Sequence, residues 1–269
     1  MGLQKTSIDL EVSVPPKNAR RNKLKMSIRF ECNINNYLTI PGSPLAYWAS
    51  SSVIAAYNNL NLDKVAQPRH GLATSDNARF LRLWFEININ NSSLSATPDY
   101  SKKWYPMNKG GDYRRWYGNN EWVINYENDG KELKDFAISI YKCSSRTIQN
   151  TQFYFVKGLT WSALTSGSFS VRYTPGGALF GSGGYCAFSE DNKLKYILAL
   201  MNNKVNVLFL SFVSPTLNYE VGHIKSIPVI INEDYHTTVD AFVDNNINLS
   251  KEDWDSFETS WDFKKHPLI

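Results

Sequence analysis

The sequence has few cysteines and no long apolar runs. Its three cysteines, Cys32, Cys143 and Cys186, are far apart and show no CxxC spacing, so a disulfide framework is not expected and a reducing compartment fits. Residues 1–25 contain no apolar core of signal-peptide length, and no later run is long enough to cross a bilayer. We therefore expect a soluble cytoplasmic protein that does not bind a membrane.

The common signatures of catalysis are also missing. The chain has no phosphate-binding P-loop, no HExxH zinc motif and no GxSxG nucleophile elbow. Its four histidines, at positions 70, 223, 236 and 266, are scattered, whereas a metal site needs several ligands together. Each histidine is better explained as a surface or structural residue, and no metal site is predicted.

One glycine-rich run, GGALFGSGG at 176–184, has the composition of a cofactor loop. A methyl-donor or dinucleotide loop should follow a buried strand, open a helix and precede an acidic residue by about 20 positions. Here RYTP precedes the run, and Tyr185–Phe188 has the character of a further strand. The context favours a turn or hairpin over a cofactor site.

Asp99 and the Glu132-x-Lys134 triplet contain the residue types of a metal-dependent nuclease centre. Carboxylates and a lysine at such loose spacing often arise by chance. Lys131–Asp135 also has the pattern of a solvated charge cluster. A divergent nuclease is therefore kept only as a minor alternative.

The composition itself is that of a folded, moderately basic protein. Hydrophobic residues make up 42% of the 269 residues and aromatic residues 14%, which is enough for one sizeable core or two small ones. The formal net charge is only +4. A nucleic-acid contact would therefore have to come from a local basic face and not from the charge of the whole protein.

Local patterns predict a β-rich α+β fold, in which twisted antiparallel or mixed sheets pack with a few helices. A strand is expected at Lys25–Ile34, and a helix capped by Ser43, with Pro44 in its first turn, is expected to end near Asn58–Asn59. A second helix is expected at Lys193–Phe212, with Asn202–Asn203 as a candidate break. Further short β-like runs are expected at 80–88, 121–127, 136–141, 152–162 and 169–175.

The most informative segment is Lys102–Lys131, which interleaves basic and aromatic side chains around a pair of glycines. Arg and Lys neutralise phosphates, aromatic faces stack on bases, and glycines let a backbone approach a ligand closely. Few ordinary structural segments need all three properties together. The segment therefore makes nucleic acid the first partner to test.

Several segments, taken together and in this order, resemble one family of enzymes. They are Gly71–Glu86 (GLATSDNARFLRLWFE), Lys103–Gly130 (which contains KGGDYRRWYGN), Gly158–Tyr173, Pro215–Val229 and Trp254–Phe263 (which contains SWDF). From about Ile40 onward, the chain is similar to the region downstream of the catalytic domain in PglX-like adenine-specific DNA methyltransferases of bacteriophage-exclusion (BREX) systems.

The resemblance implies that the chain is the DNA target-recognition part of such an enzyme, with a fold like that of a methyltransferase specificity domain. In that family an upstream Asn-Pro-Pro-Tyr or Asn-Pro-Pro-Phe motif holds the extruded adenine. The only Pro-Pro here, Pro15–Pro16, follows Val14, and no convincing methyl-donor loop is present. We therefore expect a fragment or split-gene product that is not catalytic alone. In the family, S-adenosylmethionine is the cofactor of the full-length enzyme, and no cofactor is expected in this chain.

The resemblance also implies partners and a domain organisation. The partners are double-stranded DNA, a separate catalytic methyltransferase chain and other phage-exclusion components. The expected organisation is a lead segment with an entry strand at 1–40, a helical linker at 41–61, a DNA target-recognition domain at 62–231 and a C-terminal connecting segment at 232–269. A free-standing DNA-binding specificity or interaction protein is the main alternative, ahead of the nuclease.

Within this interpretation, individual side chains take separate roles. Arg114 or Arg115 would pair with guanine edges, and Asn119 or Asn120 would address adenine. The other candidates for contact with DNA, mainly with its backbone, are Arg79, Arg82, Lys102, Lys103, Lys109, Gly110, Gly111, Tyr113, Trp116 and Lys131.

Each role has a structural alternative. Packing inside the domain explains Trp104, Trp116 and Trp122 better than stacking on a base does, while Tyr113 and Tyr117 fit either role. The two glycines form either a simple turn or a ligand-facing loop. Asp112 and Glu121 are candidate ion-pair partners for Arg115.

Overall fold

The computed structural model describes residues 38–42, 44, 46, 49–214 and 216–269 of the chain. It divides the chain into two compact units, Met1–Asn59 and Leu60–Ile269. The strand expected at Lys25–Ile34 and the helix cap expected at Ser43 lie outside the described residues.

In the first unit, helix α2 spans Ser51–Ala56. The Ser50 hydroxyl accepts a hydrogen bond from the Val53 amide and caps the helix. Pro44 and Ala49 are not helical. The prediction that the helix starts at Ser43–Pro44 is therefore wrong, because a serine further along the chain provides the N-cap.

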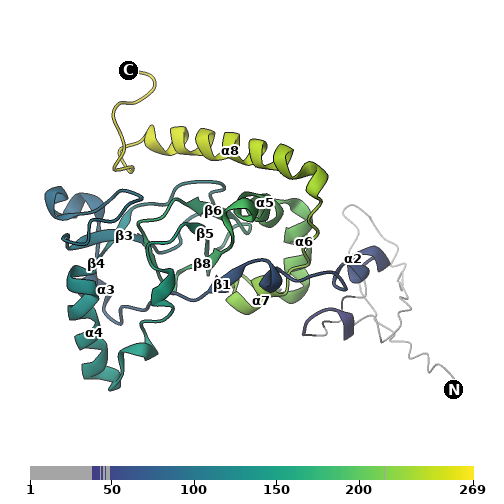
Figure 1. The fold of residues 1–269 in the computed structure, drawn as a ribbon, viewed down its shortest axis with the longest axis horizontal. Coiled ribbons are helices and arrows are strands. Elements are labelled where there is room, and N and C mark those ends of the chain that lie inside the picture. The colour runs from purple at the N-terminus through teal and green to yellow at the C-terminus, as the bar shows by residue number, and fades with distance from the viewer. Residues whose placement is uncertain (1–37, 43, 45, 47–48, 215) are drawn as a thin grey trace, which may run out of the picture. The chain divides into compact units, whose positions relative to one another are not determined.

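The second unit contains two four-stranded sheets (Figure 1). In the first sheet the strand order is β1-β8-β5-β6, and every neighbouring pair is antiparallel. The strands of this first sheet are β1 (Gln67–Arg69), β8 (Gly184–Phe188), β5 (Gly158–Ser162) and β6 (Val171–Thr174).

The second sheet is mixed. Its order is β2-β4-β3-β7, with antiparallel pairs except for the parallel pair between β3 and β7. The strands of this second sheet are β2 (Leu81–Leu83), β4 (Trp122–Asn125), β3 (Trp104–Asn108) and β7 (Leu179–Phe180). With the helices, the two sheets confirm the expected α+β fold.

Six helices accompany the sheets in the described part of the second unit. They are α3 (Asn77–Phe80), α4 (Glu127–Tyr141), α5 (Asp191–Asn202), α6 (Lys204–Val213), α7 (Val221–Lys225) and α8 (Glu233–Asp255). Short 3₁₀ turns lie at Leu62–Lys64, Trp84–Glu86, Ile89–Asn91, Ser144–Arg146 and Thr151–Phe153. Within the described ranges no single helix is long and apolar enough to cross a membrane. Helices α5 and α6 reach that length and apolar character only when taken together, and the pair is bent by 73°.

The bend between α5 and α6 lies where the sequence predicts it. Asn203 separates the two helices, and its side chain accepts a hydrogen bond from the Asn206 amide at 2.7 Å. An asparagine that bonds the backbone in this way caps a new helix instead of extending the old one. The expected helix with a break at Asn202–Asn203 is confirmed.

The two longest described helices, α4 and α8, were not predicted. Residues 136–141, expected as a strand, belong to α4, where Leu133 and Ala137 are buried one turn apart and Ile138 is exposed. Burial there follows the helical period and not the alternation of a strand. Helix α8 is rich in Asn and Asp, which are weak helix formers, and only Val239, Val243 and Ile247 of its apolar residues pack on the first core.

The glycine-rich run carries the chain from one sheet to the other. Gly176 and Gly177 have φ values of +104° and +71°, a conformation that glycine adopts with little strain. The run contains β7 of the second sheet and ends at the start of β8 in the first sheet. It opens no helix, which agrees with the expected turn and not with a cofactor loop.

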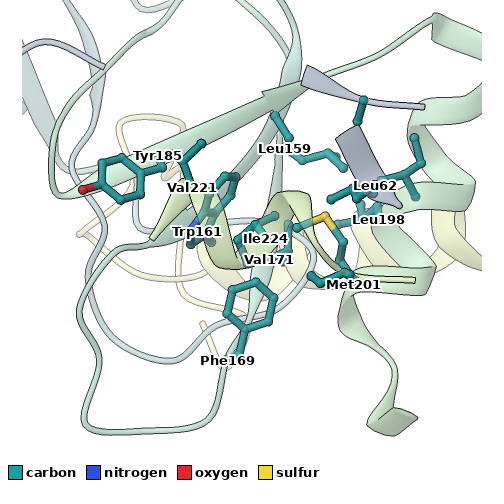
Figure 2. Close-up of a cluster of buried hydrophobic side chains, with 14 of the residues drawn as sticks. Leu62, Leu159, Trp161, Phe169, Val171, Tyr185, Leu198, Met201, Val221 and Ile224 are labelled. Carbon is teal, nitrogen blue, oxygen red and sulfur yellow. The ribbon is translucent and has the colours of Figure 1, made fainter. Parts of the chain in front are cut away.

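A hydrophobic core lies on one face of the first sheet, where helices α5–α8 cover it (Figure 2). Leu159, Trp161 and Val171 come from the strands and meet Leu198 and Ile224 from the helices. The Trp161 indole donates to the Tyr219 carbonyl oxygen at 2.9 Å, so this buried aromatic keeps a hydrogen-bond partner. A second core, which includes Phe80, Tyr105, Ile124 and Phe180, supports the second sheet.

The opposite face of the first sheet is polar but also covered. Thr160 lies beside Arg172 on one neighbouring strand and beside Cys186 on the other. Alternation along β5 puts this row on the face away from Leu159 and Trp161, yet Arg172 is only 1% exposed. Burial lowers the pKa of Arg172 to about 10, because the charged guanidinium is removed from water.

The close approach of the two sheets gives a prediction for Gly184. A Cβ atom there would lie 2.5 Å from the Gly110 nitrogen and 2.7 Å from the Asn108 oxygen. Since backbone atoms cannot move aside like a side chain, Gly184→Ala should lower the free energy of unfolding by roughly 3 kcal/mol. Urea denaturation followed by circular dichroism measures this.

Gly222→Ala is the matched control. A Cβ at Gly222, in α7, meets nothing within 4 Å, so the free energy of unfolding should stay the same or rise by up to about 1 kcal/mol. Equal destabilisation by the two substitutions would contradict the packing described here.

Candidate nucleic-acid interface

The connecting loop, defined as Lys109–Glu121, joins β3 to β4 and is bonded to the first sheet as well. The Trp116 amide donates to the Val171 oxygen at 3.1 Å, and the Tyr173 amide donates to the Trp116 oxygen at 2.7 Å. These bonds form a parallel bridge between Trp116 and Arg172 beside β6. The loop that carries most of the predicted DNA contacts is thus anchored to both sheets.

The glycine pair Gly110–Gly111 of this loop serves its packing. Gly110 has a φ of +90°, and a Cβ on it would lie 2.4 Å from the Gly183 oxygen. The Gly111 oxygen accepts a hydrogen bond from the Ser162 hydroxyl at 2.8 Å. The close approach that Gly110 permits is therefore to the protein's own backbone, which supports the structural alternative for this glycine.

The last turn of α8 holds the loop in place. Arg114 Nη1 donates to Asp253 Oδ2 at 2.8 Å, and the guanidinium lies over the Trp254 ring at 5.0 Å. Gly118 makes room for this contact, because a Cβ there would lie 2.4 Å from Arg114 Cδ and 3.0 Å from Trp254. We call these residues, Arg114, Gly118, Asp253 and Trp254, the α8 clamp.

A lysine of α8 also reaches the same loop. Lys251 Nζ lies 5.2 Å from the centre of the Tyr117 ring and pairs with Asp255 at 2.5 Å and Asp262 at 3.2 Å. Neither these contacts nor those of Asp253 and Trp254 were expected from the sequence. The signal that could have found them is the segment Trp254–Phe263, which resembles the family. Trp254 of this segment contacts the loop, although it lies far from the loop in the chain.

Exposed Tyr113 and half-buried Arg115 lie against each other in the loop. The Arg115 guanidinium lies 5.6 Å from the centre of the Tyr113 ring, and Tyr113 is 48% exposed. Within the part of the chain that the structure describes, no ion pair joins Arg115 to Asp112 or Glu121, the partners expected as an alternative. A cation stacked on an exposed aromatic ring has the properties of a nucleic-acid contact.

The remaining polar residues of the loop are more constrained. Asn119 donates to the Asp112 oxygen at 2.8 Å, and Asn120 is half-buried. Lys109 Nζ lies 3.7 Å from the centre of the Trp122 ring, and burial lowers the pKa of Lys109. Asn119 therefore helps to shape the loop, and the lysine charge rests against an indole face.

The other predicted contact residues lie outside the connecting loop and are bonded within the protein. Arg79 on α3 pairs with Glu132 at 2.8 Å, and Arg82 on β2 donates to the Ala78 and Leu81 oxygens. Lys102 donates to the Asn90 oxygen at 2.9 Å, Lys103 lies 3.9 Å from Glu127, and Lys131 on α4 pairs with Asp135 at 2.5 Å. The structure thus brings together the candidates from Lys109 to Asn120, whereas Arg79, Arg82 and Lys131 belong to other elements.

A pocket of about 310 Å³ opens beside the end of the connecting loop. Three aromatic side chains from different segments line it: Tyr117 of the loop, Trp122 of β4 and Trp261 of the C-terminal residues. The amides of Asn108 and Asn120 also line it. Apolar walls with a few polar groups are typical of small-ligand sites.

The expected alternative of a nuclease gains no support from these side chains. Asp99 accepts hydrogen bonds from the Ser101 amide and hydroxyl, which lower the pKa of Asp99. Glu132 is engaged by Arg79 and Asn125. No cluster of three or more His, Cys, Asp or Glu side chains suitable for a metal is found among the described residues.

Comparison with known proteins shows which proteins the chain is similar to. No protein-family model matches the chain. The adenine-specific methyltransferase PglX of Lacticaseibacillus casei (strain Zhang) is 37% identical over 243 residues, which are 87% of this chain and 20% of that protein. The adenine-specific methyltransferase BrxX of Escherichia coli O9:H4 (strain HS) is 39% identical over 239 residues, which are 87% of this chain and 19% of that protein.

The chain is homologous to a segment of the PglX-like adenine-specific methyltransferases. This confirms the resemblance carried by the KGGDYRRWYGN and SWDF segments. The chain spans about a fifth of the length of the curated relatives that it matches.

The α8 clamp of this PglX-like chain gives a prediction for Trp254. Trp254 is buried, so Trp254→Ala should lower the free energy of unfolding by about 3 kcal/mol and release the connecting loop. Limited trypsin digestion should then cut faster after Arg114 and Arg115 at temperatures where the protein is still folded.

Asp253→Asn serves as the control for that digestion. The Asp253 side chain of the Arg114–Asp253 pair is 61% exposed, so loss of this pair should cost about 1 kcal/mol and leave the loop mostly protected. Unchanged cleavage at Arg114 and Arg115 in Trp254→Ala would show that the clamp does not hold the loop.

Proposed function

We propose that the chain is the DNA sequence-recognition portion of an adenine-specific DNA methyltransferase of a phage-defence system, and that it does not transfer methyl groups alone. The observation that carries the proposal is the homology over 87% of the chain. The connecting loop adds support, because it presents cationic and aromatic side chains at a fixed place beside two sheets.

The division of labour follows from the chemistry of base methylation. An enzyme that modifies a base inside a duplex must extrude it and hold it in a catalytic pocket. Such a pocket and the S-adenosylmethionine site belong, in this proposal, to a catalytic part outside this chain, since the sequence has no Asn-Pro-Pro motif. The present chain holds the duplex and reads the bases beside the target, and the reaction also needs the catalytic part.

The contacts of the two arginines support different roles for them in this proposal. Arg115 lies against Tyr113, a half-exposed ring, and its planar guanidinium has the donor geometry that matches a guanine edge. Arg114 is held by Asp253, so it must exchange a carboxylate for a phosphate before it contacts DNA. We therefore assign Arg115 and Tyr113 to direct contact, and Arg114 to a contact that DNA has to compete for.

The first prediction of this proposal concerns DNA affinity. The chain should bind duplex DNA weakly, with an affinity that falls steeply as salt rises. Replacing both Tyr113 and Arg115 by alanine should lower the affinity at low salt about tenfold, the loss expected for one base or phosphate contact. Fluorescence anisotropy with a labelled duplex over a range of salt concentrations measures this.

Lys193→Ala is the matched control for the loss of positive charge. Lys193 lies on α5 and pairs with Glu190, so its removal changes the net charge equally without touching the loop. If Lys193→Ala weakens binding as much as the loop variant does, the affinity comes from overall charge and not from the loop.

The α8 clamp gives a prediction of opposite sign. Asp253→Asn removes the carboxylate that competes with phosphate for Arg114, so DNA affinity should increase roughly threefold at low salt and much less at high salt. Asp244→Asn is the control, because it removes the same charge from the same helix but from a pair with Lys195. Equal gains in both variants would mean that Arg114 takes no part in binding.

Methyl transfer itself separates this proposal from an independent enzyme. Purified chain should transfer no methyl group from S-adenosylmethionine to duplex DNA in a radioactive assay. A measurable turnover would overturn the assignment of catalysis to another part.

A further inference from the structure

The pocket beside the connecting loop has no role in the recognition of phosphates or base edges described above. It lies where several distant segments meet, among them the loop, strands β3 and β4, and residues near the C-terminus. Its volume of about 310 Å³ is at the lower end of the range for ligand sites. It therefore has room for one ring-sized group and not for a longer ligand.

The walls of the pocket are aromatic. Tyr117 is buried, and Trp122 and Trp261 are half-buried, so their rings are held in place before any ligand arrives. Lys109 covers part of Trp122 from outside, with its Nζ 3.7 Å from the ring centre. Rings held in this way are suited to stack on another flat ring, which is how proteins hold unstacked bases.

The polar groups of the pocket are amides and one charged pair. Asn120 lines the pocket, and buried Asn108 makes only long contacts through its Nδ2, 3.4 Å to Thr174 Oγ1 and 3.8 Å to Cys186 Sγ. Amides both donate and accept hydrogen bonds, as the edges of bases do. Lys251 and Asp262, paired at 3.2 Å, line the pocket as well.

We propose that this pocket holds a single unpaired nucleobase of the DNA bound to the connecting loop. The inference rests on the proposed function, since it needs DNA on the loop. It names a second contact, between Trp261 and the face of a base, that is separate from groove contacts by Arg115. A base reaches the pocket only after leaving the stack, so DNA in which one base is already unpaired binds better.

The test compares two DNAs that differ by one base. One is a fully paired duplex, and the other is the same duplex with a single unpaired 2-aminopurine in one strand. The wild-type chain should bind the second DNA about tenfold more tightly, a gain expected from stacking one base on an aromatic side chain. The 2-aminopurine fluorescence should also decrease on binding, because the base stacks again in the pocket.

Variants of Trp261 show whether the pocket is responsible. Trp261→Ala should remove the preference for the unpaired base and leave the affinity for paired DNA unchanged. Trp261→Phe, which keeps a flat ring, should retain most of the preference. Tyr100→Ala is the control, since Tyr100 is an exposed aromatic that lines neither the pocket nor the loop. Thermal unfolding identifies any variant that fails to fold.

The outcomes separate the two proposals. If the chain binds paired DNA but shows no preference for the unpaired base, or keeps that preference in folded Trp261→Ala, the pocket assignment is wrong and the proposed function stands. If the chain binds neither DNA at low salt, the proposed function fails and the pocket assignment fails with it.

Discussion

The contact between the last turn of α8 and Arg114 determines how the connecting loop is presented. Arg114 is bonded to Asp253 and stacked on Trp254, and Gly118 leaves the space that this arrangement needs. Helix α8 packs on the same core as the first sheet, so the clamp ties the loop to the most buried part of the second unit. The positions of Arg115, Tyr113 and the pocket all follow from this anchoring.

The two sheets explain why such a loop stays ordered. One end of the loop continues β3, its middle is bonded to β6 through Trp116, and its other end leads into β4. Glycine contacts between the loop and Gly183 and Gly184 bring the sheets together. A loop fixed at several points loses less conformational entropy when it binds a ligand than a free loop does.

Part of this fold could be predicted from sequence. The break between α5 and α6 and the strand at Trp122–Asn125 follow from local chemistry, since an asparagine cap and a short apolar run bounded by polar residues act over a few residues. Residues 136–141, expected as a strand, form a helix instead. The helix buries Leu133 and Ala137 against the second core, and local sequence does not reveal this packing. Helix α8 was not predicted because its Asn and Asp residues have low helix propensity. Packing on the core, which local sequence does not show, stabilises it.

The candidate site shows the same limit. The composition of Lys102–Lys131 correctly marks an unusual segment, yet Arg114 and Asp253 are 139 residues apart in sequence, and no local pattern links them. Likewise, Gly110 lies in a segment whose composition suggests a ligand-binding glycine, but it packs against Gly183. Homology shows that the chain is similar to a segment of adenine-specific methyltransferases, whereas only the structure separates side chains bonded within the protein from those on its surface.

Amide hydrogen exchange with and without duplex DNA tests the central claim most directly. The claim is that the connecting loop, held by the α8 clamp, is the part of the chain that faces DNA. DNA should slow exchange in peptides that cover Lys109–Glu121 and the last turn of α8, and leave peptides from Lys131–Tyr141 of α4 unchanged. Protection confined to α4, or none in the loop under conditions where DNA is bound, would contradict the account.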